Sequence, residues 1–451
     1  MMNGSLNPRM TICVTAFALN IGAASFAHAQ QGQAQAQGQT QGQGQTQAQG
    51  QTQGQGQTQA QGQTQGQGQA ATQAPLPAES QPTMEIYGFA MMDMIYDAEQ
   101  NDPNWFDVVR PTKLPAFHHE FGEDKHTWAG VRQSRLGVEA QSPTPIGDLK
   151  TKFEFDLFGV GPDAGQTTFR LRHAYGEIGH FLAGQTDSVF MDGSTFPNTI
   201  EYWGPNGMVY FYNVQFRWTP YQGDNEVAIA LERPGASGDA GIFARRIELQ
   251  NVLGRFPLPD LTAHYRATRG WGHVQVAGIV RDIAWDDLLE DQFDLSGRAT
   301  GWGVNLTSNI KFGKDTLHLG AVYGEGIENY MNDAPIDVGA EPDLFNRRTP
   351  VRGEALPVLG LMAFYDHSWS DRWTSSGGYS SVNIDTSAGQ LPSDFKFGQY
   401  SVVNLLYNNT NVLAGGEFQW GRRKNNTDGF ISNDYRVQFS FKYNFSYKLG
   451  G

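Results

Sequence analysis

Hydrophobic and polar residues alternate with a period of two along much of the chain, and the last such stretch is the clearest. Six apolar or aromatic residues occupy every second position from Val437 to Tyr447, and polar residues fill the positions between them. Successive side chains of a strand point to opposite faces, so this pattern predicts a strand with one apolar and one polar face. The alternation recurs at 149–157, 213–218, 261–268 and 302–310.

The connections between these strands alternate between short and long. Short turns are expected near Pro143–Gly147, Phe181–Gly184, Pro220–Asn225, Arg269–Gly272, Phe312–Asp315, Ser370–Arg372 and Asn408–Asn411. Long loops are expected near 98–130, 160–166, 191–207, 234–258, 282–299, 325–356, 386–397 and 425–433. Alternation alone also permits a β-sandwich, but only an outer-membrane barrel has reason to place short turns at one end and long loops at the other.

These features predict an all-β fold, a transmembrane antiparallel β-barrel. Seven turns and eight loops separate sixteen strands, although a count of 18 stays open. A barrel of about 16 strands is wide enough to enclose an aqueous channel. The apolar faces then meet lipid, and the polar faces line the lumen.

The first 83 residues lack this alternation. Residues 1–29 are predicted to be a secretory signal peptide, since Arg9 precedes an apolar run that ends in the small residues Ala27 and Ala29. Residues 30–83 form a Gln-rich low-complexity segment and linker, expected to be disordered in the periplasm because its repeats hold no apolar side chain larger than alanine. Its alternative is a β-aggregating tract. The barrel is expected over 84–451.

Composition removes several other classes of protein. The formal charge is −14 with no Lys/Arg-rich block, which argues against nucleic acid as a partner. The single Cys lies in the predicted signal peptide, so the exported chain has no disulfide and no thiolate chemistry. The histidines form no compact ligand set and Gly-x-Ser-x-Gly is absent, so we expect no metal, no cofactor and no enzyme activity.

The predicted inward face carries more basic than acidic residues. The basic residues assigned to it are Arg135, Lys150, Lys152, Arg170, Arg172, Arg217, Arg266, Arg281, Arg423, Arg436 and Lys442. The acidic ones are Glu139, Glu154, Asp156, Glu226, Glu232 and Glu417. A basic lumen concentrates anions. Arg170 and Arg172 share one face of their strand, and no acid alternates with them. This arrangement suits capture of a dicarboxylate and argues against complete pairing of the basic residues with acidic ones. The alternative is that all these charges pair across strands.

A long loop from Met191 to Asn206 is expected to narrow the channel. Its constriction candidates are Asp192, Phe196, Glu201 and Tyr202. The alternative is an exposed loop whose aromatic residues simply pack together.

Several strings resemble the DcaP-like family of outer-membrane porins. They are Tyr87-Gly88-Phe89, Arg132-Gln133-Ser134-Arg135-Leu136-Gly137, Thr144-Pro145-Ile146-Gly147, Phe153-Glu154-Phe155-Asp156, and 170–177 followed by 183–186. The resemblance implies a homotrimeric 16-stranded porin for dicarboxylates and aromatic carboxylates, with a basic constriction. It places Arg135, Arg170 and Arg172 on the pore wall and Arg132 near its extracellular end. Best-known members carry a coiled coil before the barrel, whereas 31–69 has no heptads.

The sequence therefore predicts an outer-membrane porin for passive diffusion of small hydrophilic solutes, with a preference for anionic carboxylates. Its expected partners are those solutes, outer-membrane lipid and lipopolysaccharide, and two further copies of the chain. Pore-lining candidates are Arg132, Arg135, Arg170, Arg172, Arg217, Lys150 and Lys152. The alternatives are a structural or adhesive barrel with a blocked lumen and, third, an outer-membrane enzyme.

Overall fold

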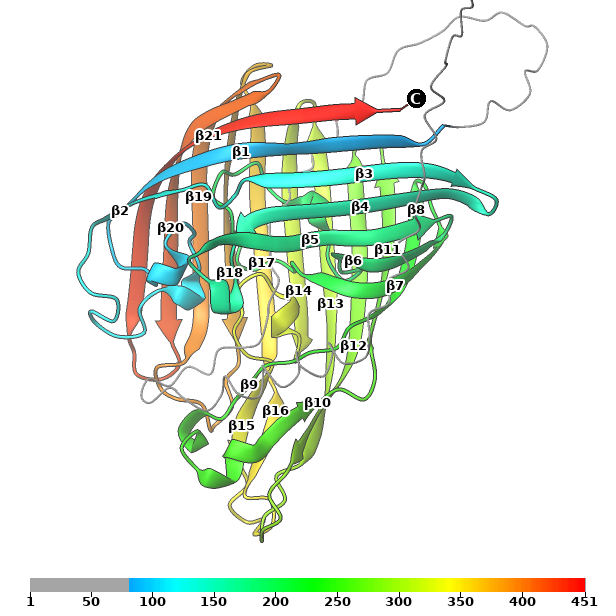
Figure 1. Cartoon of the computed structure of the whole chain (residues 1–451). Coiled ribbons are helices and arrows are strands. Elements are labelled where there is room, and N and C mark those ends of the chain that lie inside the picture. The colour runs from blue at the N-terminus through cyan, green and yellow to red at the C-terminus, as the bar shows by residue number, and fades with distance from the viewer. Residues whose placement is uncertain (1–80, 451) are drawn as a thin grey trace, which may run out of the picture. The chain divides into compact units, whose positions relative to one another are not determined.

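A computed structural model describes residues 81–450, which form a closed antiparallel β-barrel of sixteen strands (Figure 1). The barrel strands are β1 (Thr83–Asp97), β3 (Arg135–Thr144), β4 (Gly147–Phe158), β5 (Thr167–Ile178), β6 (Phe181–Asp187), β7 (Tyr212–Tyr221), β8 (Asn225–Glu232), β11 (Asp260–Arg269), β12 (Gly272–Asp287), β13 (Gly297–Phe312), β14 (Asp315–Glu325), β17 (Pro357–Ser368), β18 (Trp373–Ile384), β19 (Phe395–Asn409), β20 (Val412–Asn425) and β21 (Ile431–Leu449). The fold predicted from the alternation is confirmed. The predicted signal peptide and nearly all of the Gln-rich segment lie outside the described residues.

The barrel closes because its first strand pairs with its last. β1 pairs with β21 from Met84 opposite Leu449 to Asp97 opposite Arg436, and β1 also pairs with β3 (Figure 1). Closure leaves no barrel strand with a free edge. Two short strands also belong to the sheet: β2 (His126–Gly130) pairs with β1, and β10 (Val252–Arg255) pairs with β12. The sheet therefore has 18 strands, of which sixteen form the barrel.

The outer face of the barrel is apolar and its inner face is polar over much of its circumference. On β21, Phe439 and Phe441 are 51% and 45% exposed, whereas the intervening Gln438 and Ser440 are completely buried. A soluble protein would bury the aromatic side chains and expose the polar ones. This reversal is the pattern of a wall with lipid outside.

One predicted turn is misplaced by two residues. The chain reverses at Gly179 and His180, not within Phe181–Gly184. Gly179 adopts a φ of +56°, a left-handed conformation that glycine tolerates best, so this pair makes the turn. Phe181 begins β6, stacks on Phe216 of β7 and faces outward.

We number the eight long loops L1 to L8 in chain order: 98–134, 159–166, 188–211, 233–259, 288–296, 326–356, 385–394 and 426–430. They hold seven short 3-10 helices: η1 (Pro103–Trp105), η2 (Pro111–Lys113), η3 (Gly161–Asp163), η4 (Gly193–Thr195), η5 (Gly241–Phe243), η6 (Ile247–Asn251) and η7 (Glu328–Tyr330). A separate small sheet joins β9 (Gly238–Asp239) in L4 to β15 (Val338–Pro342) and β16 (Val351–Ala355) in L6. Within residues 81–450, no helix has the length and apolar character needed to cross a bilayer.

Candidate functional site

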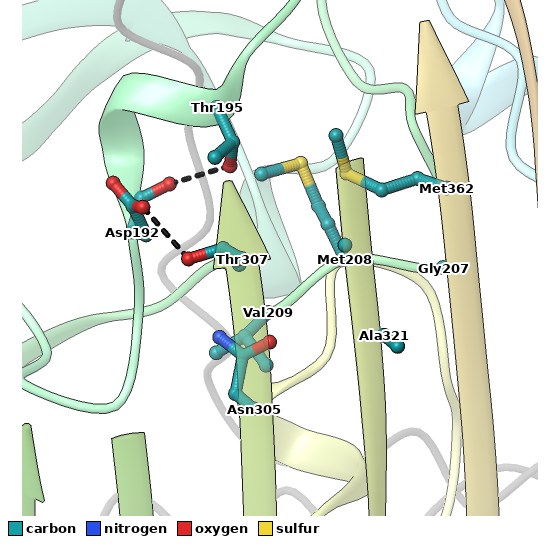
Figure 2. A pocket seen from close by; sticks show the side chains of 10 residues that line it. Asp192, Thr195, Gly207, Met208, Val209, Asn305, Thr307, Ala321 and Met362 are labelled. Atoms are coloured by element: carbon teal, nitrogen blue, oxygen red, sulfur yellow. Dashed lines mark hydrogen bonds between the residues drawn. The ribbon is translucent and has the colours of Figure 1, made fainter. Parts of the chain in front are cut away.

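L3 folds into the lumen and is fastened to the wall at its first residues. Glu232 on β8 accepts hydrogen bonds from the Ser188 hydroxyl and the Val189 backbone amide, both at 2.9 Å. Further along, Asp192 contacts Nε2 of His273 on β12 at 2.7 Å and accepts from the Thr307 hydroxyl on β13 (Figure 2). These contacts hold the start of L3 against β8, β12 and β13.

The remainder of L3 continues around the inner wall. Asp366 on β17 accepts a hydrogen bond from the backbone amide of Asn198 at 3.2 Å. Glu417 on β20 accepts from the backbone amides of Ile200 and Glu201 at 3.0 and 2.9 Å. Tyr202 then reaches β4 and β5. L3 thus forms hydrogen bonds with strands spread around the barrel, and these bonds hold it inside the lumen. The strands are β4, β5, β8, β12, β13, β17 and β20.

The two acidic constriction candidates of L3 have different electrostatic environments. Burial alone would raise the pKa of Asp192, but the hydrogen bond from His273 and the charge of Arg266, 3.0 Å away, hold it well below the usual range. Burial raises the pKa of the Glu201 carboxyl. Four hydrogen bonds oppose this rise, and their donors are the backbone amides of Gly204, Trp203 and Val109 and the hydroxyl of Tyr400. Asp192 therefore carries a charge at neutral pH, and Glu201 acts mainly as an acceptor that organises L3 and L1.

L1 and L6 meet L3 in the middle of the lumen. The Arg110 guanidinium of L1 lies 4.1 Å from the ring centre of Trp105 and 4.3 Å from that of Trp203 in L3. Its Nε donates to Asp333 of L6 at 2.9 Å, and Asp333 also accepts from the Thr112 amide at 3.0 Å. We call residues 103–114 of L1, 188–211 of L3 and 326–337 of L6 the lumen plug.

Apolar side chains of the lumen plug pack against an apolar part of the inner wall. Phe190 and Tyr210 of L3 and Tyr330 of L6 are buried in one cluster with wall residues. The wall residues of this cluster include Ile279, Val322, Val358, Met362, Phe364, Val382, Tyr400 and Val402. The loops consequently cover this part of the inner wall, and the wall from β12 to β19 is more apolar than the sequence analysis predicted.

A substitution at Gly207 tests whether this seating of L3 is required. A Cβ at Gly207 would collide with the carbonyl oxygens of Ser381 and Leu361 in the wall, so Gly207→Ala is expected to lower the free energy of unfolding by about 1–3 kcal/mol. The measurement is the temperature at which folded barrels convert to the unfolded form on gels. Gly235→Ala, whose Cβ meets no atom within 4 Å, is the matched control. Equal stability of the two variants would contradict the seating of L3.

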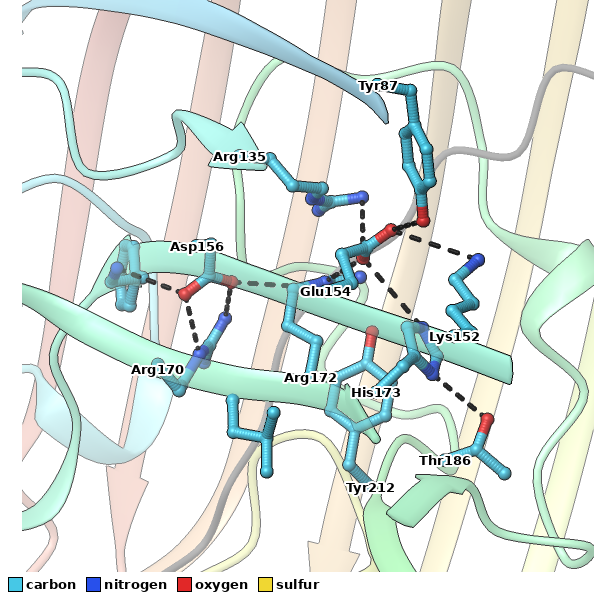
Figure 3. Close-up of polar contacts among 12 residues, drawn as sticks. Tyr87, Arg135, Lys152, Glu154, Asp156, Arg170, Arg172, His173, Thr186 and Tyr212 are labelled. Atoms are coloured by element: carbon cyan, nitrogen blue, oxygen red, sulfur yellow. Dashed lines mark hydrogen bonds and ion pairs between the residues drawn. The ribbon is translucent and has the colours of Figure 1, made fainter. Parts of the chain in front are cut away.

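Opposite the apolar wall, β3, β4 and β5 carry a cluster of charges (Figure 3). Asp156 and Arg170 form an ion pair, in which Asp156 accepts from Nε of Arg170 at 3.0 Å. Glu154 accepts from Nε of Arg172 at 2.6 Å and lies 3.6 Å from Arg135. The ladder between β4 and β5 shifts register here, which turns both Arg172 and His173 inward.

Arg170 and Arg172 each form an ion pair with a neighbouring acid, contrary to the expectation from β5 alone. Arg170 and Arg172 are only 4% and 1% exposed, and their acids come from the neighbouring strand β4. Tyr202 adds a third group: its hydroxyl accepts from Nη2 of Arg170 at 2.7 Å and from Nη1 of Arg172 at 3.0 Å. The predicted constriction loop and the predicted basic strand therefore meet at one site.

The other pore-lining candidates lie apart from this pair. Arg132 belongs to L1 rather than to the wall and is 1% exposed, bound to Asp107 and to the carbonyls of Gly159 and Gln166. Lys152 contacts Glu139 at 2.8 Å. Lys150 is exposed beside Glu177, and Arg217 donates to Gln215. The structure thus assigns Arg132 to the anchoring of L1, places Lys152 at the edge of the charge cluster, 3.9 Å from Glu154, and places Lys150 and Arg217 on a more open part of the wall.

The expected excess of basic residues is not found among the buried charges. Seven arginines and fourteen Asp and Glu residues of the described chain are buried. Several of these acids, such as Asp93 and Asp97 on β1 and Asp333 and Asp337 in L6, were not assigned to the lumen from the sequence. Asp333 and Asp337 went unassigned because loop residues carry no alternation, and an acid in a loop is most simply read as solvated. Asp93 and Asp97 lie on β1, which has apolar residues on both faces and so shows no clear alternation.

The described residues contain no group of three or more His, Cys, Asp or Glu side chains arranged to hold a metal ion. The contacts of Asp192, His273 and Thr307 connect L3 to the wall, and both the hydroxyl and the imidazole are directed at the carboxylate. That arrangement differs from a nucleophile activated by a histidine base.

Comparisons with known proteins agree with the geometry. The family model for the DcaP outer membrane protein matches residues 34–445. The solved outer-membrane channel DcaP of Acinetobacter baumannii is 19% identical, with a TM-score of 0.65, over 83% of this chain and 100% of that one. An anion-selective porin from Comamonas acidovorans is 11% identical, with a TM-score of 0.50, over 81% and 100%. No curated protein matches the chain.

Proposed function

Because the chain belongs to the DcaP outer membrane protein family and is thus an outer-membrane porin, we propose that it carries small anionic solutes, with a preference for dicarboxylates. The cluster on β3, β4 and β5 supports this preference. Four cations, Arg135, Lys152, Arg170 and Arg172, lie within 4 Å of only two acids, Glu154 and Asp156. Glu139 offsets one of the two remaining positive charges through Lys152.

This local surplus lies where Tyr202 of L3 meets the wall. A positive charge in a confined site of low dielectric constant attracts anions more strongly than the same charge in water. Guanidinium groups also bind carboxylates in a planar, bidentate geometry. Several of the acids elsewhere in the barrel are hydrogen-bonded to the backbone of the loops, for example Glu417 to L3 and Asp333 to L1.

Solute flux into proteoliposomes tests the proposal. Succinate is expected to enter faster than arabinose, a neutral solute of similar size, because only succinate gains from the arginine cluster. Equal rates for the two solutes would leave a porin without charge preference and would contradict the proposal.

A second candidate is a structural or adhesive barrel with a blocked lumen, and the lumen plug favours it. Wall residues such as Val382, Tyr400 and Gln438 are completely buried beneath the loops. Passage of solute therefore needs the lumen plug to move. Absence of flux of any solute through barrels verified as folded would favour this candidate.

We propose further that three copies assemble through the wall of β5 to β8. These strands have 7 to 12 residues, whereas β12, β13, β19 and β21 have 15 to 19. A short apolar wall matches the bilayer poorly, and a neighbouring copy would cover it. Lipid and lipopolysaccharide are the partners we expect around the remaining outer wall. The mass of the detergent-solubilised protein tests the assembly, and a monomeric mass would contradict it.

A further inference from the structure

Tyr202 of L3 occupies the space between the two arginines of β5. Its hydroxyl donates to Asp156 and accepts from Nη2 of Arg170 and Nη1 of Arg172. A phenolic oxygen has one proton to donate and two lone pairs, so all of its hydrogen-bonding capacity is used here. The ring is buried, with its centre 4.7 Å from that of Phe158.

The same arginine pair is left incomplete. Nη1 of Arg170 is buried and has no hydrogen-bond acceptor within residues 81–450, although the side chain is only 4% exposed. A buried donor without an acceptor is costly, especially on a charged group. The pair is thus bound by the carboxylates of Asp156 and Glu154 and by the neutral hydroxyl of Tyr202, and Nη1 of Arg170 keeps a hydrogen bond that a further anion can accept.

We propose that the Tyr202 hydroxyl holds the place of a solute carboxylate and that Tyr202 is thereby a specificity-determining residue of the channel. An incoming carboxylate accepts the hydrogen bonds from Arg170 and Arg172 that the hydroxyl now accepts. Hydrogen bonds from arginine to a carboxylate are about twice as strong as those to a neutral oxygen, so the exchange favours anions over neutral solutes. No covalent bond or proton is transferred. This inference rests on the proposed function and deepens it.

The displacement of Tyr202 would also reach the lumen plug. The Tyr202 ring and its neighbour Trp203 lie in one apolar cluster with Trp105 and Val108 of L1. Arg110 lies against both Trp105 and Trp203, whose ring centres are 4.8 Å apart, and binds Asp333. Binding of a carboxylate at the arginine pair is therefore coupled to the contacts that hold L1 across the lumen, so a solute can loosen the plug that stands in its way.

Equilibrium binding of succinate to the folded protein, measured by calorimetry, tests the exchange without relying on conduction. Tyr202→Phe keeps the ring and removes the competing hydroxyl, and is expected to bind succinate about tenfold more tightly. Tyr400→Phe is the control, because it also removes a hydroxyl that holds L3, through Glu201, but lies away from the arginine pair. It is expected to bind succinate as the unmodified protein does.

Each outcome has a distinct meaning. Equal or weaker binding by Tyr202→Phe, while the unmodified protein binds succinate, would overturn the exchange and leave the proposed function intact. Equal tightening in both variants would overturn it too, since a general loosening of L3 would then suffice. No binding by the unmodified protein would reject the proposed function itself, and the exchange with it.

Discussion

Replacing Arg170 and Arg172 together by alanine is expected to remove the preference of the channel for anions and to weaken succinate binding at least 100-fold. Two guanidinium groups supply the charge-assisted hydrogen bonds at the site, and each such bond contributes about 1.5–3 kcal/mol. The cluster then retains Arg135 and Lys152 against Glu154, Asp156 and Glu139, so its net charge becomes negative. The measurements are succinate affinity and the permeability ratio of anions to cations.

The same double substitution is expected to destabilise the barrel by about 3–5 kcal/mol, because it leaves buried Asp156 without either of its cations and Glu154 without Arg172. Arg281→Ala controls for this loss of stability. Arg281 is also buried, with 2% of its surface exposed. It forms two ion pairs, with Asp260 and Asp337, each with an N–O distance of 3.0 Å. Its loss should destabilise the protein but leave succinate binding unchanged. Equal loss of binding in both variants would contradict the assignment of the site.

Asp333→Ala is expected to release L1 and to raise the mean conductance several-fold. The substitution removes the acceptor for Arg110 and Thr112 and leaves a buried guanidinium without its counter-ion, a loss of about 3–5 kcal/mol for a pair of this kind. Because Arg110 lies against both Trp105 and Trp203, its release also weakens the packing of L1 on L3, in which the two ring centres are 4.8 Å apart. Single-channel recording and hydrogen exchange of residues 103–114 measure the two effects.

Asp333→Asn is the matched variant. The amide oxygen can still accept from Arg110 and the Thr112 hydroxyl, so the variant loses the charge and the acceptor of the Thr112 backbone amide only, and the increase in conductance should be smaller than for alanine. Faster hydrogen exchange in L1 without a change in conductance would show that L1 does not obstruct the pathway. Unchanged exchange would show that Asp333 does not hold L1.

The barrel wall was predictable because its determinants are local. Alternation fixes which face of a strand is apolar, as Phe439 and Gln438 illustrate, and the contrast of short turns with long loops fixes the order of strands. The turn predicted at Phe181–Gly184, which the structure places at Gly179 and His180, shows the limit of this approach. Gly184 also lies in that region, and only the backbone shows which glycine makes the turn.

The interior could be predicted only in part, because it depends on residues distant in sequence. The acids that neutralise Arg170 and Arg172 lie on β4, and which residues of β4 face them depends on a shift in register that alternation does not reveal. Arg132 lies three residues before Arg135 in one motif, yet it belongs to L1. Asp333 meets Arg110 across 223 residues of sequence, and no local signal marks either of them.

Tyr202 and Glu201 were candidates because aromatic and acidic residues lie together in a long loop of the right position. Their burial inside the lumen agrees with that placement, but the reason for it is again non-local. Glu417 on β20 binds the backbone of L3, and Asp156 on β4 binds the Tyr202 hydroxyl. A loop sequence alone does not specify the wall residues that receive it.

The most direct test of the central claim is the reversal potential of the unmodified protein in a planar bilayer under a gradient of potassium chloride. The arginine cluster predicts a sign that corresponds to selectivity for chloride over potassium, and succinate should reduce the current. Selectivity for potassium would contradict the account, because it would show that the other twelve buried acids, and not the cluster on β3 to β5, set the field that a solute meets.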